Sequence, residues 1–214
     1  MPNALLLVDV QPDFMPGGGL AVAEGDEILL GIASLLANPA FHTVVATQDW
    51  HPADHISLAR NHPDHQPFDV IELYGHEQTL WPDHCIQDSD GAALHAELAL
   101  AAVDLILRKG ADPAVDSYSA FRNNYDAQGI RPSTGLVGYL RDRSVDAVFI
   151  CGLARDFCVA WTAMDSVAAG FDTTIIWDLT RSVDPSGDAE LEKRLTDTGI
   201  HIVQSTHPAL EGNR

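Results

Sequence analysis

The sequence predicts an α/β fold: a doubly wound, mainly parallel six-stranded sheet with helices on both faces. Short apolar or β-branched runs alternate with segments of helical spacing about six times along the chain, and such alternation is typical of a parallel sheet. The first run, at residues 5–8, is apolar throughout, as expected for a strand covered on both faces. With 214 residues, 46% of them hydrophobic, the chain can bury one core, so we expect a single domain over residues 1–214.

The first half of the chain contains two predicted strands and one predicted helix. The strand at 5–8 is followed by a helix at 27–37, where apolar residues recur at helical spacing until Asn38-Pro39 ends the pattern. A second strand follows at 43–47. From residue 49 to residue 90 no period is evident, and the stretch is rich in His, Pro and Asp. We expect a functional loop there, because long structureless loops are otherwise uncommon in compact domains.

The second half of the chain alternates more regularly between strand and helix. We expect strands at 105–107, 147–150, 173–177 and 202–203, and helices at 91–102, from Ser133 or Thr134 to Arg143, from the region of Cys158 to Ala169, and near 189–198. A further loop spans 110–131. The glycines at 17–19 have no strand before them and no helix directly after them, so they predict a turn rather than a phosphate-binding loop.

The charge of the chain limits which molecules it can bind, and its cysteine content indicates the cellular compartment. The chain has 31 acidic and 12 basic residues and a net charge of −19, which disfavours binding to nucleic acid or to an anionic membrane. Three cysteines in no framework spacing argue against a disulfide scaffold and favour a reducing compartment. The apolar N-terminal run is too short for a signal or membrane segment. We therefore expect a cytoplasmic protein, and the sequence leaves open whether it forms a homo-oligomer.

Cys158 is the first candidate for chemistry. It follows the predicted strand at 147–150 and Gly152, and it falls in the first turn of a predicted helix. The partial positive charge of a helix N-terminus favours the thiolate, which is a nucleophile. The alternative is a small buried hydrophobic residue, which is the commonest role of a lone cysteine.

Three further polar residues occupy equivalent positions after strands. Asp9 follows the first strand, Asp49 the second and Lys109 the third, and ligands of such sheets bind at the carboxyl ends of the strands. Each residue alone could be a turn cap, an Asx-turn residue or a surface lysine. Together with Cys158 they suit attack on an acyl carbon: Asp9 would accept the thiol proton, Lys109 would hold the negative charge, and a thioester would form and be hydrolysed.

A candidate metal site lies in the long loop. Asp49 and His51 alternate along the chain, so their side chains can point the same way, and His84 follows in Trp81-Pro-Asp-His84. One carboxylate and two imidazoles suit a first-row divalent metal ion. His55 could be an additional ligand. The chain has ten histidines, so the alternative is chance pairing of surface residues.

Five separated motifs, in order and across nearly the whole chain, resemble the nicotinamidases, also called pyrazinamidases, of the isochorismatase-like hydrolases. The motifs span residues 9–14 (DVQPDF), 47–55 (TQDWHPADH), 81–85 (WPDHC), 109–110 with 116–121 (KG and DSYSAF) and 152–159 (GLARDFCV). The resemblance implies hydrolysis of nicotinamide to nicotinate and ammonia, a step of NAD salvage, and of pyrazinamide. It implies a catalytic triad, which would be Asp9, Lys109 and Cys158. It also implies one divalent metal ion, with zinc as the first candidate and iron or manganese as alternatives. The metal ligands would be Asp49, His51 and His84.

The resemblance also assigns the walls of the substrate pocket. Phe14 and Trp81 would line it, although both could be core aromatics. A cis peptide bond before Ala154 would direct backbone N–H groups at the developing oxyanion. Arg155 departs from the small or apolar residue expected at its position, and Phe157 replaces a common tyrosine.

Two rival functions remain open from the sequence. Another cysteine amidohydrolase of the superfamily, acting on N-carbamoyl compounds or similar small amides, would share the triad. A non-catalytic acidic scaffold would share only the fold, and it would have no need of both the triad and the metal group. An isochorismatase fits less well, because that reaction needs neither a thiol nor a metal.

Overall fold

A computed structural model describes residues 2–37 and 40–210. It contains a six-stranded sheet in the order β5-β2-β1-β6-β7-β8, and every neighbouring pair is parallel. The strands are β1 (Asn3–Val8), β2 (Thr43–Asp49), β5 (Leu105–Lys109), β6 (Ala147–Leu153), β7 (Asp172–Arg181) and β8 (His201–Val203). The strand order reverses between β1 and β6, so the predicted doubly wound sheet is confirmed.

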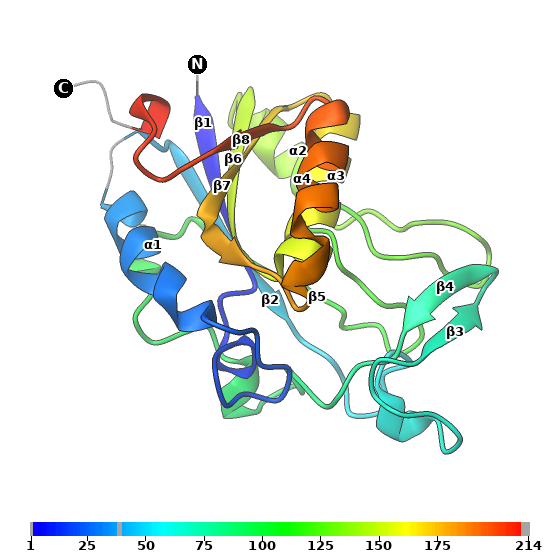
Figure 1. Cartoon of the computed structure of the whole chain (residues 1–214). Coiled ribbons are helices and arrows are strands. Elements are labelled where there is room, and N and C mark those ends of the chain that lie inside the picture. Colours follow the sequence, from blue (N-terminus) through cyan, green and yellow to red (C-terminus); the bar gives the residue numbers. More distant parts are fainter. Residues whose placement is uncertain (1, 38–39, 211–214) are drawn as a thin grey trace.

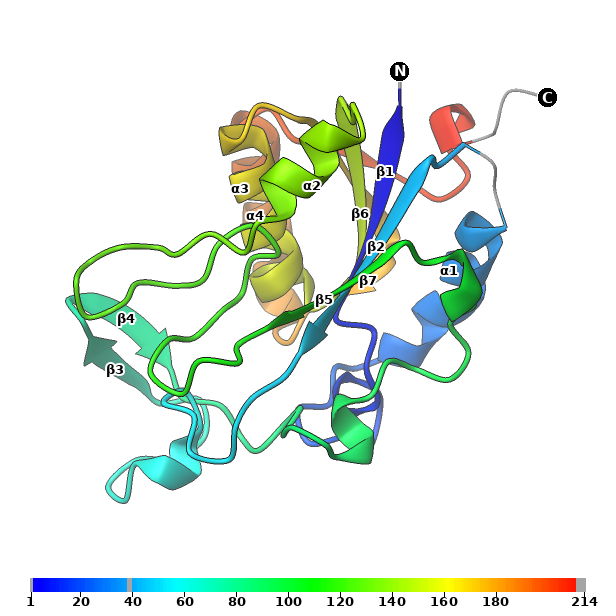
Figure 2. The ribbon, with the colours of Figure 1, turned by 180° about the vertical axis from the view of Figure 1, so that it is seen from behind.

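Helices cover both faces of this sheet, as predicted. They are α1 (Leu29–Leu36), α2 (Leu136–Asp142), α3 (Ala160–Ala168) and α4 (Asp188–Asp197). Figures 1 and 2 show α1 on one face and the other three helices on the opposite face. The α2 helix begins after Gly135 rather than directly after Ser133 or Thr134, and the predicted helix end at 38–39 lies outside the described residues. Among the residues described, no helix has the length and apolar character needed to cross a membrane.

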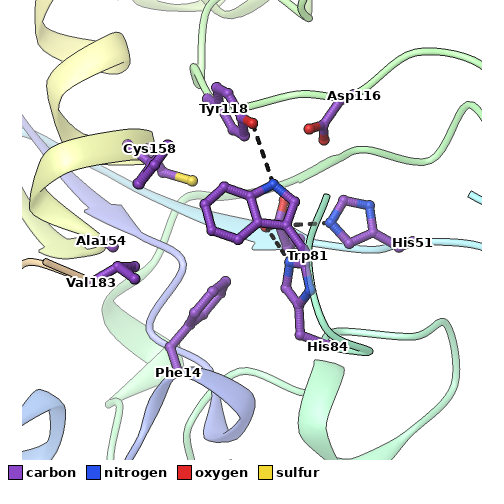
Figure 3. A pocket seen from close by; sticks show the side chains of 11 residues that line it. Phe14, His51, Trp81, His84, Asp116, Tyr118, Ala154, Cys158 and Val183 are labelled. Carbon is purple, nitrogen blue, oxygen red and sulfur yellow. Dashed lines mark hydrogen bonds and ion pairs between the residues drawn. The ribbon is translucent and has the colours of Figure 1, made fainter. Parts of the chain in front are cut away.

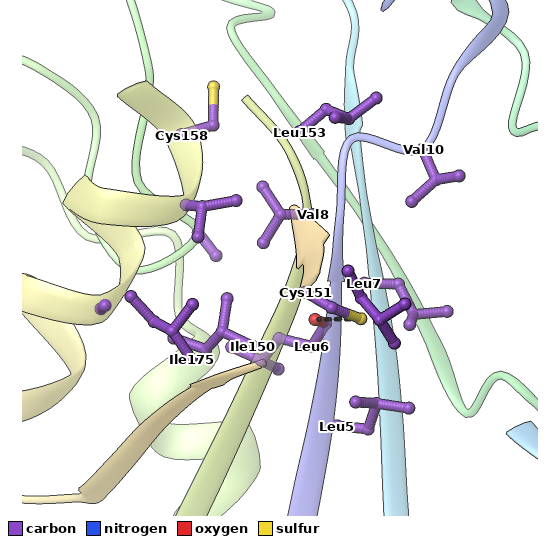
Figure 4. Packing of buried hydrophobic residues seen from close by; sticks show 14 of the residues in the cluster. Leu5, Leu6, Leu7, Val8, Val10, Ile150, Cys151, Leu153, Cys158 and Ile175 are labelled. Carbon is purple, nitrogen blue, oxygen red and sulfur yellow. Dashed lines mark hydrogen bonds between the residues drawn. The ribbon is translucent and has the colours of Figure 1, made fainter. Parts of the chain in front are cut away.

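The central strand β1 anchors the core. Leu5, Leu6 and Leu7 are completely buried, and they pack beside Ile150 of β6 (Figure 4). Burying such a side chain contributes about 1.5–3 kcal/mol. This apolar centre fixes where β1 ends, and therefore fixes the position of Asp9, the first residue beyond it.

The predicted helix at 91–102 is wrong. The structure has only short 3-10 turns there, at Asp90–Ala92 and Leu100–Ala102. The side-chain amides of Gln11 and Gln48 both donate to the carbonyl of Ala92, at 2.9 and 2.7 Å. The N–H of His95 donates to Val10. Because these tertiary contacts take up backbone groups that a helix would use, the segment forms a series of turns instead of a helix.

The expected loop over 49–90 contains a small β-hairpin. Strands β3 (Val70–Leu73) and β4 (His76–Thr79) pair antiparallel, and they are joined by Tyr74 and Gly75, both with positive φ, as a tight hairpin turn requires. The hairpin lies beside the loop over 110–131 (Figures 1 and 2). The ring of His76 stacks on Tyr125 there, with centroids 3.6 Å apart.

Candidate active site

The sheet brings the four predicted strand-end residues together at its carboxyl edge. Asp9 follows β1, Asp49 ends β2, Lys109 ends β5, and Cys158 lies in the turn that follows β6. Asp49 and Lys109 are direct partners in the register of β2 and β5. Since β5, β2, β1 and β6 are successive neighbours in the sheet, residues separated by up to 149 positions meet.

Lys109 is the centre of this cluster. Its Nζ lies 2.9 Å from Asp9 Oδ2, 2.5 Å from Asp49 Oδ1 and 3.4 Å from Cys158 Sγ. It also donates to the carbonyl of Ser117 at 2.9 Å. Burial alone would lower the pKa of Lys109, but the Asp49 and Asp9 carboxylates outweigh it and hold the pKa well above its usual value. The side chain is therefore a buried ammonium ion.

Asp9 is placed as a proton acceptor. Thr47 orients it: the Thr47 hydroxyl donates to Asp9 Oδ1 at 2.6 Å and accepts from the Asp9 N–H at 3.0 Å. Burial and the nearby Asp49 charge raise the pKa of Asp9 to about 6, against the lowering effect of Lys109. A carboxyl group with this pKa is mostly ionised at neutral pH and is still basic enough to take a proton.

Cys158 lies in a π-helical turn, Arg155–Val159, directly before α3. Gly152 has a φ of +115°, and an added Cβ would fall 2.0 Å from the carbonyl oxygen of Val8, so glycine is needed where β6 approaches β1 before this turn. Burial raises the pKa of the Cys158 thiol well above its usual value despite Lys109, and the nearby Asp9 and Asp49 carboxylates raise it further. The expectation of a favoured thiolate is therefore wrong for the resting state, because desolvation outweighs the neighbouring cation.

The predicted metal ligands also converge. Oδ2 of Asp49 lies 3.6 Å from Nε2 of His51 and 3.9 Å from Nε2 of His84. On each ring Nδ1 faces a backbone carbonyl, that of Gly110 at 3.0 Å and that of Pro82 at 2.8 Å. A carbonyl only accepts, so each Nδ1 carries a proton and each Nε2 faces Asp49. Burial lowers the pKa of His51, but the Asp49 carboxylate outweighs it and raises this pKa above its usual value. A backbone carbonyl bound to the other ring nitrogen is typical of metal-binding histidines, and one carboxylate with two imidazoles fits a divalent metal ion.

A small pocket opens between the thiol and this donor set. Its cavity of about 20 Å³ is lined by Phe14, Asp49, His51, Trp81, His84, Asp116, Tyr118, Ala154, Phe157, Cys158 and Val183. Figure 3 shows Cys158, Ala154 and Val183 on one side and His51, His84 and Asp116 on the other. All three predicted substrate-binding residues, Phe14, Trp81 and Ala154, are in the wall, and the peptide bond between Leu153 and Ala154 is cis.

Several pocket residues were not singled out from the sequence. Asp116 is buried, and Tyr118 accepts hydrogen bonds from Trp81 Nε1 and Gln78 Nε2. His55, which the sequence already offered as an additional ligand, is not among the residues that line the pocket, but it is also buried, with its ring 4.3 Å from that of His51. His51, His55 and Asp116 place donor atoms within 4.8 Å of one another. These residues come from loops whose course depends on tertiary contacts. The only signal for Asp116 and Tyr118 was their place in the motif at 116–121.

The family model described as the isochorismatase domain matches residues 3–207. The chain belongs to the isochorismatase family. This membership agrees with the sheet order and with the position of the cluster at the end of β1, β2, β5 and β6.

Within the isochorismatase family, this chain is similar to several nicotinamidases and pyrazinamidases. A nicotinamidase of Acinetobacter baylyi is 48% identical over 87% of this chain and 85% of its own length. The solved structure of an Acinetobacter baumanii nicotinamidase and pyrazinamidase superimposes with a TM-score of 0.89 at 47% identity, over 95% of this chain and 96% of that one. The pyrazinamidase of Pyrococcus horikoshii, solved in complex with zinc, has a TM-score of 0.75 at 32% identity, over 95% and 99% of the two chains.

Proposed function

We propose that this protein hydrolyses nicotinamide to nicotinate and ammonia through a thioester on Cys158. The observation that carries the proposal is the shared contact of Lys109 Nζ with Asp9, at 2.9 Å, and with Cys158, at 3.4 Å. A nucleophile, a base and a cation at these distances suit acyl transfer from a small amide. The nicotinamidase activity of the relatives gives the substrate class.

The reaction uses one proton shuttle. The Cys158 thiol gives its proton to Asp9 as the sulfur attacks the carboxamide carbon. The leaving nitrogen takes that proton from Asp9, the C–N bond breaks, and ammonia departs from the thioester. A water molecule then attacks the thioester carbon and gives a proton to Asp9. The C–S bond breaks, the sulfur regains the proton from Asp9, and nicotinic acid leaves and ionises.

Lys109 stabilises the charge that moves through this cluster. Its ammonium touches both the carboxylate that gains and loses the proton and the sulfur that becomes anionic. Because the side chain is fully buried, water screens this attraction little. Lys109 therefore acts as an electrostatic partner of Cys158 and Asp9, and its raised pKa keeps it from donating a proton itself.

The aromatic walls select a flat ring. Phe14 and Trp81 line the pocket between the thiol and the metal-ligand group, and a planar heteroaromatic amide presents complementary faces.

Asp49, His51 and His84 would hold one divalent metal ion, and zinc is the first candidate because the Pyrococcus horikoshii structure contains it. When bound, the metal supplies a Lewis acid for the ring nitrogen of the substrate. His51 and His84 are kept in the required tautomer by Gly110 and Pro82. Burial lowers the pKa of His84 to about 4, so its ring is neutral and its Nε2 is available at neutral pH.

An ammonia-release assay on a panel of amides tests the proposal. The panel contains nicotinamide, pyrazinamide, benzamide and an N-carbamoyl amino acid, and the metal content is measured on the same sample. We expect nicotinamide to have the highest kcat/KM, with pyrazinamide also hydrolysed and benzamide, which lacks the ring nitrogen, turned over poorly. Release from the N-carbamoyl compound without release from nicotinamide would replace the proposal with the other amidohydrolase function.

A further inference from the structure

The turn that carries Cys158 also carries two consecutive charged residues that bind the same distant segment. Arg155 and Asp156 stand at the start of the π-helical turn. Both side chains reach the chain between the end of β7 and the start of α4, residues 180–188. This segment contributes one residue, Val183, to the wall of the catalytic pocket.

Arg155 is buried, with 7% of its surface exposed. Its Nε donates to Thr180 Oγ1 at 2.8 Å, its Nη2 donates to the carbonyls of Thr180 and Trp177 at 2.7 and 3.0 Å, and its Nη1 pairs with Asp188. The guanidinium also lies 4.1 Å above the ring of Trp177. A charged group so fully bonded holds its partners at fixed positions, because releasing any one of them leaves a buried charge or acceptor unsatisfied.

Asp156 holds the next residues of the same segment. Its Oδ1 accepts from the backbone N–H of Val183 and its Oδ2 from that of Asp184, each at 3.0 Å. Hydrogen bonds to a carboxylate are stronger than those between neutral groups. The backbone of Val183 is therefore tied directly to the residue two positions before Cys158.

We propose that Arg155 and Asp156 form a clamp that fixes Val183 against the substrate ring, so that this pair of positioning residues sets the affinity for the ring. Val183, Ala154 and Cys158 lie on one side of the pocket (Figure 3). Ser182 is buried and donates to Asp188, and Val183 packs against the core, but residues 184–187 are exposed. The bonds to Asp156 are what hold the backbone N–H groups of Val183 and Asp184. The inference rests on the proposed function for its substrate, but the clamp itself does not.

The first test is Asp156→Ala, with Asp184→Ala as the matched control. Asp184 is the neighbouring exposed carboxylate of the same segment, and its side chain accepts a hydrogen bond from the N–H of Ser186 within the turn. We expect Asp156→Ala to raise the KM for nicotinamide about tenfold with kcat changed less than about threefold, since a fixed wall contributes to ring binding rather than to bond breaking. Asp184→Ala should keep the parent KM.

A double variant separates positioning from general stability. If Asp156 acts through Val183, then Val183→Ala alone should raise KM, and adding Asp156→Ala should raise it little further. Effects on KM that multiply in the double variant would overturn the proposal. Asp156→Asn keeps the side-chain size and one acceptor oxygen, so it should raise KM less than Asp156→Ala does. It replaces Asp156→Ala in this test if the alanine variant does not fold.

Hydrogen exchange at the two donor amides makes the test independent of the substrate. The N–H groups of Val183 and Asp184 should exchange at least about tenfold faster in Asp156→Ala than in the parent, since their acceptor is removed. Unchanged protection would overturn the clamp. A parent protein that releases no ammonia from nicotinamide would reject the proposed function, whereas the exchange rates would still decide whether Asp156 fixes Val183.

Arg155→Lys tests the other half of the clamp. Lysine keeps the charge but has no planar fork, so it cannot reproduce the contacts with Thr180, Trp177 and Asp188 together. We expect KM to rise in the same direction, with the pH dependence of kcat unchanged because neither Asp9 nor Cys158 is touched. A parent-like KM in this variant would restrict the clamp to Asp156 and overturn the role of Arg155.

Discussion

Lys109 Nζ lies 2.5 Å from Asp49 Oδ1, and this contact joins the thiol cluster to the candidate metal site. The same ammonium pairs with Asp9 at 2.9 Å, and the side chains of both Lys109 and Asp9 are fully buried. Two carboxylates of different proposed roles therefore share one cation. The triad and the metal ligands are consequently not independent, and a change at Lys109 must affect both.

Lys109→Met should remove activity and destabilise the fold in a pH-dependent way. Loss of the cation leaves Asp9 and Asp49 facing each other, and removing one partner of a buried ion pair costs about 3–5 kcal/mol. The pKa of Asp9 is already above its unfolded value and would rise further, so ionising it in the folded state costs stability as pH rises. Urea unfolding should therefore show a larger deficit at pH 7.5 than at pH 5. The control is Lys193→Met, which changes an exposed lysine paired with Asp197 on α4. If Lys109→Met lowered the free energy of unfolding equally at both pH values, the shared-cation interpretation would be contradicted.

The pH profile of kcat/KM should have an acid limb set by Asp9. Below a pKa of about 6 the carboxyl group is protonated and cannot accept the thiol proton, so activity should fall about tenfold per pH unit there. The pKa of Cys158 is far above neutral, so a protonated thiol is the reacting form. We expect a plateau between pH 7 and pH 8.5, measured with saturating metal. A continued tenfold rise per unit across that range would show that a preformed thiolate is required.

The sequence predicted most of the site because parallel strands place their ends at one edge. Asp9, Asp49, Lys109 and Cys158 each follow or end a recognisable apolar run, so their convergence depends only on the sheet. The residues that were missed depend on contacts between segments. Val183 reaches the pocket because Asp156 binds its N–H, and no local pattern encodes that bond.

The two wrong expectations have related causes. The segment at 91–102 has helical spacing, but Gln11 and Gln48 take the carbonyl of Ala92 from across the sheet. The thiolate of Cys158 was expected from the helix N-terminus, but complete desolvation dominates its pKa. A local sequence pattern reflects helix propensity and the helix dipole, whereas burial and the hydrogen bonds donated by remote side chains depend on the folded structure.

Cys158→Ala should abolish ammonia release while the fold persists. We expect a loss of at least about a thousandfold in kcat, as for removal of a nucleophile in other covalent hydrolases. Cys151→Ala is the matched control, because Cys151 is also buried and lies in the preceding strand, where its thiol faces the carbonyl of Leu6 at 3.9 Å (Figure 4). Circular dichroism checks the fold of both variants. Residual activity of Cys158→Ala close to that of Cys151→Ala would reject the nucleophile.

Alanine substitutions at two glycines test whether His51 is a metal ligand without changing His51 itself. Gly110 has a φ of +65°, and an added Cβ would fall 2.4 Å from Cε1 and 2.6 Å from Nδ1 of the His51 ring. Gly129 has a similar φ of +73° with nothing within 4 Å of the added atom. Both alanine variants therefore carry the same backbone strain, about 1 kcal/mol, and only Gly110→Ala displaces the imidazole.

We expect Gly110→Ala to weaken metal binding at least about tenfold, because displacing a ligand ring also breaks its bond to the Gly110 carbonyl. Gly129→Ala should bind metal as the parent does. Competition with a chelating dye measures the dissociation constants, and urea unfolding of the metal-free proteins checks that the strain is comparable. Equal metal affinity in the two variants would mean that His51 does not bind the ion.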